Sequence, residues 1–230
     1  MSGRVPAVAL ALTVSACGLR SEVKPREADA GLAQVTATSA SASPPHADEI
    51  TGTAPAGTVV GRVVDPANQP LKDAIVWVLD LPPERSDPKT HALIDQVSKS
   101  FVPHVLPVLV GSTVDFKNSD AVMHNAYSRA NPAKFDLGRY PAPESRSFQF
   151  GQAGRVDVFC AVHSHMHTIV MVLETSRFAV TDERGQFRID RVPEGSHAIR
   201  AWHEFAEQTD AHVAVGGQKG ATVTIAMGAQ

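Results

Sequence analysis

The sequence predicts an all-β protein built from β-sandwiches. From Gly57 onward, apolar and polar residues alternate with a period of two rather than 3.6, which indicates strands rather than helices. Short apolar runs recur at close spacing and are separated by turns that contain Gly and Pro, which is typical of sandwiches. We find no pattern typical of a long helix.

The expected strands follow one another between recognisable turns. Residues 66–70 (Pro-Ala-Asn-Gln-Pro) form the first turn, a Gly-Ser pair at 111–112 forms another, and in the turn at 182–185 Gly185 supplies a position with φ > 0. The segments 81–100 and 124–145 are interrupted by prolines, and we expect loops there, with at most a turn of helix at 91–99. We expect strands at residues 58–65, 74–79, 105–110, 113–116, 146–150, 155–160, 168–173, 177–181, 186–189, 196–202, 212–215 and 222–227.

The composition excludes several classes of protein. The chain has 230 residues, of which 43% are apolar and 20% are charged, as in ordinary folded proteins. A net charge of −3 leaves no basic excess for a phosphate backbone, so nucleic acid is not an expected partner. Two cysteines, Cys17 and Cys160, are too few for a scaffold held by disulfides, and no apolar run is long enough for a membrane-spanning helix.

The N-terminal residues 1–17 have the pattern of a secretory signal, with Arg4 before a short apolar stretch. The box Val14-Ser15-Ala16-Cys17 resembles that of bacterial lipoproteins, and the resemblance implies that Cys17 is lipidated. A plain signal peptide or a short buried apolar segment is the alternative. Residues 18–56 are rich in Ala, Ser, Thr and Pro, which predicts a flexible tether. The lipoprotein interpretation places the protein in a bacterial cell envelope, anchored to a membrane and facing the periplasm or the cell surface.

A metal site is predicted where the expected strand 155–160 ends in Cys160, and His163 and Met166 follow with the spacing C-x2-H-x2-M. A thiolate, an imidazole and a thioether are donors that select copper over hard cations. A trigonal copper site needs one more imidazole, and His124 is the candidate. Copper binding would also occupy a thiol that otherwise has no partner in an oxidising compartment.

This region resembles the cupredoxins, the blue-copper family of plastocyanin and amicyanin. Its upstream part shares Phe101-Val102-Pro103, Val110-Gly111, Val114-Asp115-Phe116 and Asn118-Ser119-Asp120, and its short copper loop is amicyanin-like. The resemblance implies a cupredoxin-like Greek-key β-sandwich over residues 90–174 with one type 1 copper. It implies that His124, Cys160 and His163 are the equatorial ligands, that Met166 is the weak axial ligand, and that Asn125 ties the two ligand loops together.

Other kinds of metal site fit the residues of this region less well than a type 1 copper site does. The neighbours of Cys160 are not the histidines of a multicopper oxidase, and a binuclear electron-transfer site needs a second cysteine in the loop. Zinc remains an alternative, because Cys and His also suit it. His165 and His167 have no counterpart in the loop pattern; we expect them at the surface, or as donors to an additional metal. His104 is expected to be structural, and four histidines are expected to be ordinary surface residues: His46, His91, His197 and His212.

The flanks of the copper region resemble a carboxypeptidase regulatory-like (transthyretin-type) domain. Residues 61–78 fit its opening strands, residues 181–187 fit its T-D-x-x-G-x-F hairpin, and residues 192–202 fit its closing turn and strand. The resemblance implies a second small prealbumin-like β-sandwich made of residues 57–82 and 175–229, into which the copper domain is inserted. A single extended cupredoxin is the alternative. Trp202-His203-Glu204 is either an exposed strand end or a contact with the copper domain.

The function that these features favour is transfer of single electrons between redox proteins by an envelope blue-copper protein, which is not an enzyme. Copper storage, delivery or sensing without electron flow is the alternative. A structural lipoprotein with an empty site is a weaker hypothesis.

Overall fold

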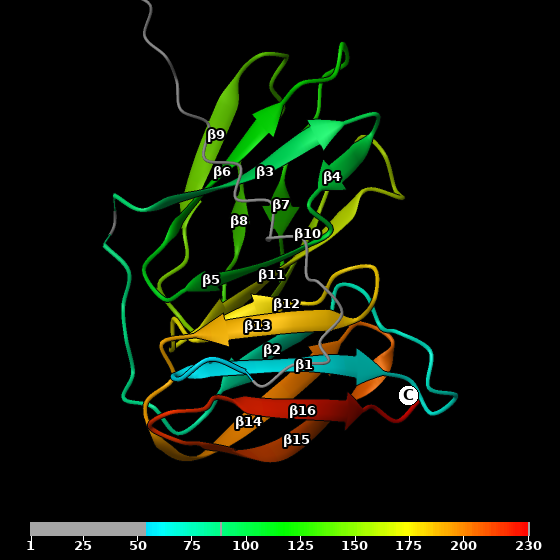
Figure 1. Cartoon of the computed structure of the whole chain (residues 1–230). Helices are drawn as coiled ribbons and strands as arrows, with labels where there is room; N and C mark the ends of the chain where they lie inside the picture. Colours follow the sequence, from blue (N-terminus) through cyan, green and yellow to red (C-terminus); the bar gives the residue numbers. More distant parts are fainter. Residues whose placement is uncertain (1–53, 88, 230) are drawn as a thin grey trace, which may run out of the picture. The chain divides into compact units, whose positions relative to one another are not determined.

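The computed structural model describes residues 54–87 and 89–229, which form sixteen strands in four sheets (Figure 1). The predicted all-β fold class is therefore confirmed. The predicted signal at 1–17, with Cys17, lies outside the described residues, as does most of the predicted tether at 18–56. The described residues contain no helix with the length and apolar character that crossing a membrane requires.

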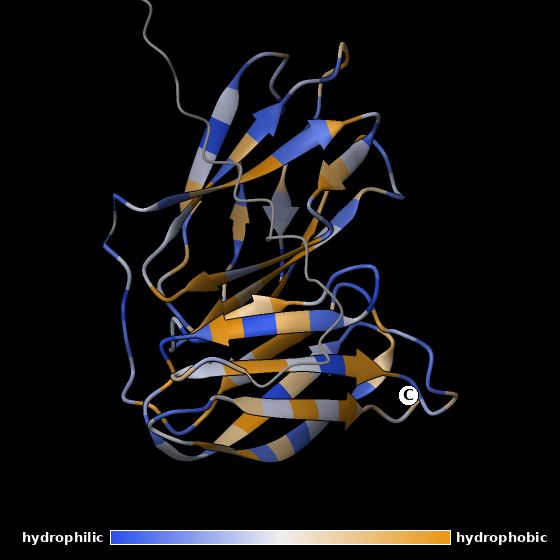
Figure 2. Ribbon diagram, in the orientation of Figure 1, coloured by the Kyte–Doolittle hydropathy of each residue, from blue (hydrophilic) through white to orange (hydrophobic). Residues whose placement is uncertain are grey.

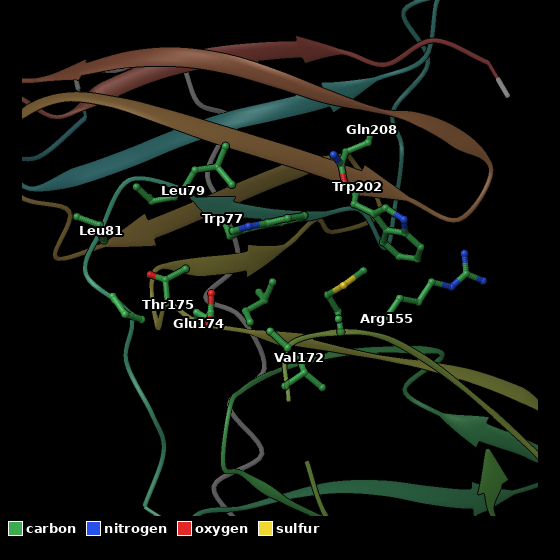
Figure 3. A pocket seen from close by; sticks show the side chains of 15 residues that line it. Trp77, Leu79, Leu81, Arg155, Val172, Glu174, Thr175, Trp202 and Gln208 are labelled. Carbon is green, nitrogen blue, oxygen red and sulfur yellow. The ribbon is translucent and has the colours of Figure 1, made fainter. Parts of the chain in front are cut away.

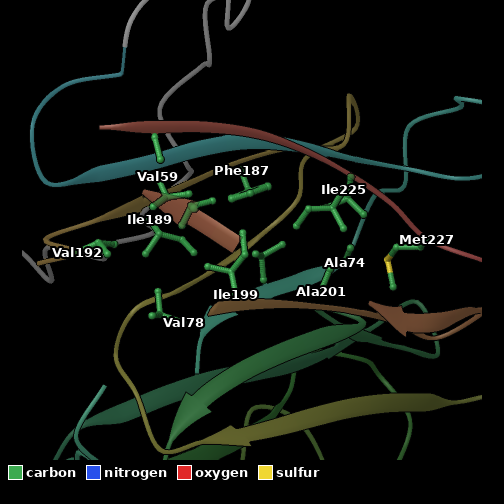
Figure 4. Close-up of a cluster of buried hydrophobic side chains, with 14 of the residues drawn as sticks. Val59, Ala74, Val78, Phe187, Ile189, Val192, Ile199, Ala201, Ile225 and Met227 are labelled. Atoms are coloured by element: carbon green, nitrogen blue, oxygen red, sulfur yellow. The ribbon is translucent and has the colours of Figure 1, made fainter. Parts of the chain in front are cut away.

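Two sheets from the two ends of the described chain form what we call the flank sandwich. Their orders are β13-β1-β16 and β12-β2-β14-β15. One apolar cluster with members from both sheets forms its core, including Val59, Phe187, Ile199 and Ile225 (Figure 4). In Figure 2, β13 alternates between hydrophobic and hydrophilic residues, as expected for a strand with one buried face. The strands are β1 (Thr58–Val64), β2 (Ile75–Val78), β12 (Phe178–Val180), β13 (Gln186–Asp190), β14 (Gly195–His203), β15 (Ala206–Val215) and β16 (Ala221–Ala226).

The other two sheets form the central sandwich, with orders β4-β3-β6-β9 and β5-β11-β10-β7-β8. Its core contains Ile94 and Phe116 from one sheet and Val156 and Val170 from the other, together with Cys160. The strands are β3 (His91–Val97), β4 (Ser100–Val102), β5 (Val105–Leu109), β6 (Thr113–Asn118), β7 (Tyr127–Ser128), β8 (Phe135–Asp136), β9 (Ser145–Gln149), β10 (Gly154–Phe159) and β11 (His167–Leu173). The insertion of this part as a separate domain stays a prediction.

Strand β11 is apolar along nearly its whole length because both of its faces are buried. Val170 and Val172 point into the core of the central sandwich. Ile169 and Met171, on the opposite face, belong to a second cluster that includes Trp202 of β14. The two sandwiches therefore share an apolar contact, in which Trp202 takes part. Of the two interpretations of the segment 202–204, contact with the central sandwich is the one that the structure shows.

The loop prediction for residues 81–100 is wrong over its second half, and so is the turn of helix at 91–99. β3 pairs in parallel with β6 and antiparallel with β4. Ser98 and Lys99 connect β3 to β4 with φ angles of 52° and 58°. A two-residue hairpin turn with positive φ at both positions is usually signalled by Asn-Gly or Asp-Gly. The two turn residues here are Ser and Lys, so the sequence contains no recognisable signal for this hairpin.

Two further segments differ from the prediction by more than two residues. The segment 124–145 contains two short paired strands, β7 and β8. β15 begins at Ala206 rather than at residue 212. Four of the added residues are polar and only Ala206 is buried, and they pair with β14 at the edge of its sheet. An exposed edge strand needs no apolar alternation, which is why the pattern missed its first half.

Candidate metal centre

Two loops of the central sandwich carry the predicted ligands. His124 lies between β6 and β7, and Cys160, His163 and Met166 lie in the turn between β10 and β11. The backbone N–H of Met166 donates to the carbonyl of His163 at 3.1 Å, and that of Cys160 donates to the carbonyl of Met166 at 3.3 Å. These bonds close the loop, so that the chain returns to Cys160 before β11 starts.

The donor atoms of His124, Cys160 and His163 all lie within 4.8 Å of one another. The Cys160 Sγ atom is 3.8 Å from Nδ1 of His124. The rings of His124 and His163 have centroids 4.9 Å apart. Three donors from two separate loops therefore converge on one point, as a coordination site requires.

The burial of these side chains fits a metal ligand set. His124 is fully buried, Cys160 and Met166 are 4% and 1% exposed, and all but His163 lie inside the core. Nδ1 of His163 is buried without a hydrogen-bond partner. Because buried polar atoms almost always have a partner, an unpaired imidazole nitrogen beside a thiol is consistent with a metal ligand. The site fits the copper that its donor chemistry implies.

Asp120 holds the His124 ring. Its Oδ2 accepts a hydrogen bond from Nε2 of His124 at 2.8 Å, which leaves Nδ1 facing Cys160. The same carboxylate accepts the backbone N–H groups of Ser98 and Lys99 at 2.6 and 2.7 Å. Burial alone would raise the pKa of Asp120, but the hydrogen bonds from Lys99, His124 and Ser98 outweigh it and lower this pKa below its usual value. A carboxylate on the second nitrogen is the usual support of a metal-binding histidine.

The backbone of His124 is held by Tyr140. The N–H of His124 donates to the Tyr140 carbonyl at 3.2 Å, and the N–H of Tyr140 donates back at 2.9 Å. The Tyr140 hydroxyl donates to the carbonyl of Phe116 and accepts from Gln96, both at 2.8 Å. Burial raises the pKa of Tyr140 to about 12, so the hydroxyl stays protonated and keeps its donor role. The ligand is thus fixed at both its ring and its backbone.

Asn125 connects the two ligand loops, as the resemblance implies for it. Its Oδ1 accepts the N–H of Ala161, the residue after Cys160, at 2.7 Å. The N–H of Val162 points at the Cys160 sulfur at 3.4 Å. This N–H group and the Asn125 amide together hold the start of the second ligand loop beside the first.

The environment of His163 favours its neutral form. Burial, and next the neighbouring His124 and Lys99, lower the pKa of the His163 imidazole. A neutral imidazole is the metal-binding form. His124, Cys160, His163 and Met166 together are consistent with a type 1 copper site. Zinc shares three of these donors, but the buried thioether of Met166 suits copper.

Three other histidines lie in different surroundings. His165 is exposed, and its Nε2 lies 3.1 Å from the carbonyl oxygen of Lys99. His167 is 22% exposed, between buried and exposed, and contacts Asp157 and Glu204. The surface expectation is wrong for His197, which is 8% exposed and contacts Asp80 of the flank sandwich, because the β14 strand turns its ring inward.

A cavity of about 460 Å³ lies apart from this centre, and none of the four predicted ligands lines it. Trp77 and Trp202 line it from the flank sandwich, and Arg155 and Val172 line it from the central one (Figure 3). The sequence did not predict the role of Asp120, although its position four residues before His124 was an available signal.

Part of the chain is similar to solved copper proteins. A reduced mutant of amicyanin matches 43% of this chain and 98% of its own at 23% identity, with a TM-score of 0.35. A purple cupredoxin from Nitrosopumilus maritimus matches 36% of this chain and 99% of its own at 23% identity, with a TM-score of 0.33. The copper-containing nitrite reductase of Thermus scotoductus matches 51% of this chain at 25% identity, with a TM-score of 0.36, and the match spans 28% of that enzyme.

No protein-family model matches the sequence, and no curated protein matches it. At these TM-scores the structural likeness is local, so the assignment of the centre rests on its own donor atoms and their burial. Those observations describe a largely buried group of two histidines, a cysteine and a methionine in a β-sandwich, which is consistent with a type 1 copper site.

Proposed function

We propose that this protein carries single electrons between redox partners through a type 1 copper centre. The observation that supports this most strongly is the convergence of His124, Cys160 and His163 in a buried position, with Nδ1 of His163 left unpaired. Copper, when bound there, supplies a one-electron couple between Cu(I) and Cu(II). The chain's own part is to hold the donors in one geometry for both oxidation states.

Hydrogen bonds hold the ligand loops in place, which suits electron transfer. Asp120 fixes the His124 ring, and Asn125 ties the two loops together. Little rearrangement on oxidation or reduction means a low barrier to transfer. No nucleophile or acid–base pair is needed for this function, and we propose that the protein is not an enzyme.

A docking surface for redox partners adjoins the centre. Val122 and Met123 precede His124 and are 41% and 49% exposed, and Val162 precedes His163 and is 40% exposed. Exposed apolar side chains beside a partly exposed ligand suit brief contacts through a small interface. We place electron entry and exit at His163, which is the least buried of the three convergent ligands.

Storage or delivery of copper is the alternative. A delivery site needs exposed, exchangeable donors, whereas His124, Cys160 and Met166 are buried. The rate of copper loss to a strong chelator separates the two functions. Slow loss of copper to the chelator supports electron transfer, and complete loss of copper within the mixing time supports delivery.

The test is to add Cu(II) to the reduced full-length apoprotein and to record the visible absorption spectrum. We expect an intense thiolate-to-copper charge-transfer band that ascorbate bleaches and oxidant restores. Cys160→Ala should lose the band. His91→Ala, which removes an exposed histidine on β3, is the matched control and should keep it. A weak band that is the same in Cys160→Ala would overturn the proposal.

We also propose that Cys17 anchors the protein in a bacterial envelope, where electron donors and acceptors would meet it. The support is the Val14-Ser15-Ala16-Cys17 box. Labelling of cells with a fatty-acid analogue should mark the wild-type chain and leave Cys17→Ser unmarked. Equal labelling of both chains would contradict the anchor.

A further inference from the structure

A second cluster of metal-binding side chains lies where the two sandwiches meet. His104 lies between β4 and β5, His167 is the first residue of β11, and Glu204 follows β14 of the flank sandwich. One donor atom from each residue lies within 4.8 Å of the other two. This cluster shares no residue with the centre at Cys160.

The two rings present one nitrogen each to Glu204. Nε2 of His104 is 2.6 Å from one carboxylate oxygen, and Nδ1 of His167 is 3.6 Å from the other. Their remaining nitrogens point to acceptors: Nδ1 of His104 lies 3.3 Å from the carbonyl oxygen of His167, and Nε2 of His167 lies 2.9 Å from Oδ1 of Asp157. This is how metal-binding histidines are supported, by a backbone carbonyl or a carboxylate on the far nitrogen.

A positive charge between the two rings and the Glu204 carboxylate would stabilise this arrangement. If the far nitrogens carry the protons, Nε2 of His104 and Nδ1 of His167 both turn lone pairs toward a carboxylate that is only 15% exposed. No Lys or Arg among the described residues forms an ion pair with Glu204. A proton on a ring or a metal ion can supply the charge, and a metal ion would use all three donors at once.

We propose that His104, His167 and Glu204 bind a borderline divalent ion of the Zn²⁺ type. Two imidazoles and one carboxylate suit such ions and leave a fourth position for water. Donors around tetrahedral zinc are roughly 3.4 Å apart, from metal–ligand distances near 2.1 Å. The separation of 3.6 Å between His167 and Glu204 matches this already. Nε2 of His104 is at hydrogen-bond distance from the other carboxylate oxygen, so His104 must move outward to admit an ion, which its 42% exposed side chain allows.

A bound ion would join the two sandwiches next to the first centre. His167 follows Met166 directly, and its ring stacks on Phe159 at 4.8 Å between centroids. Phe159 in turn precedes Cys160. The second site therefore holds the start of β11 to the flank sandwich through Glu204, beside both ends of the copper loop.

Calorimetric titration of the full-length chain with Zn²⁺ tests the proposal, after one equivalent of copper has been added. We compare the wild type with His104→Ala and Glu204→Gln, and use His91→Ala as the matched control, because it removes another exposed histidine that faces a carboxylate. The variants should lose one Zn²⁺ per chain, or bind it at least about tenfold more weakly. The control should bind like the wild type.

Thermal unfolding gives a second measurement on the same proteins. Zn²⁺ should raise the melting temperature of the wild type and of His91→Ala, and raise it less in the other two variants. Equal Zn²⁺ binding in all four proteins, or no saturable binding in the wild type, would overturn the proposal. The comparison is made between variants, so it holds whether or not the first centre binds copper, which the absorption band reports separately.

Discussion

Replacing Asp120 by Asn tests how the chain positions His124, the buried candidate copper ligand. In the wild type one oxygen accepts from Nε2 of His124 and from the N–H of Lys99, and the other accepts from the N–H of Ser98. An amide has a single acceptor oxygen. Whichever way the Asn side chain turns, at least one of these donors faces an NH₂ group instead of an acceptor.

The expected losses of stability and of copper affinity follow from this missing acceptor. A hydrogen-bonding group that loses its partner in a buried place costs about 1–3 kcal/mol, and the His124 side chain is fully buried. Loss of a partner behind a metal ligand lowers metal affinity about 10–100-fold. We therefore expect Asp120→Asn to unfold more easily by about 1–3 kcal/mol and to bind copper at least tenfold more weakly, with a shifted charge-transfer band.

Denaturant unfolding, competition with a copper chelator and absorption spectroscopy measure these effects. Asp210→Asn is the matched control, since Asp210 pairs with Arg200 on the surface of the flank sandwich and such pairs contribute at most about 1 kcal/mol. The control should keep copper affinity and spectrum. Wild-type affinity and an unchanged spectrum in Asp120→Asn would refute the view that this carboxylate positions His124.

The remaining predictions concern the loops and the pH dependence. Asn125→Ala removes the acceptor of the Ala161 N–H and should broaden the copper spectrum; an unchanged spectrum would show that this link is dispensable. Burial alone would raise the pKa of Asp157, but hydrogen bonds from Arg155 and from a histidine ring lower it. Its contribution to stability is thus complete above the unfolded pKa of about 3.9 and is lost as the pH falls through the lower folded pKa, so unfolding curves of Asp157→Asn and the wild type should converge in acid. Gly185→Ala forces a side chain into φ +70° with Cβ 2.4 Å from a backbone oxygen, and should cost more than about 1 kcal/mol in denaturant unfolding; a smaller loss would mean that the turn relaxes.

The sequence predicted the elements whose signal is local. One-sided burial produces alternation, so most strands of the flank sandwich were readable, and Gly185 has the positive φ that its turn requires. The hairpin of β3 and β4 was not readable, because its Ser98-Lys99 turn carries no glycine. Its conformation is stabilised from outside, by the carboxylate of Asp120.

By itself, the sequence determined the all-β class and the ligand types, because strand periodicity and the spacing of Cys160, His163 and Met166 are properties of short segments. Only the tertiary structure decided which distant groups the carboxylates of Asp120 and Glu204 contact. Asp120 meets the β3–β4 turn, and Glu204 meets His104, across separations of 21 and 100 residues. Such contacts depend on how sheets pack, and packing of distant segments leaves no periodic trace in the chain.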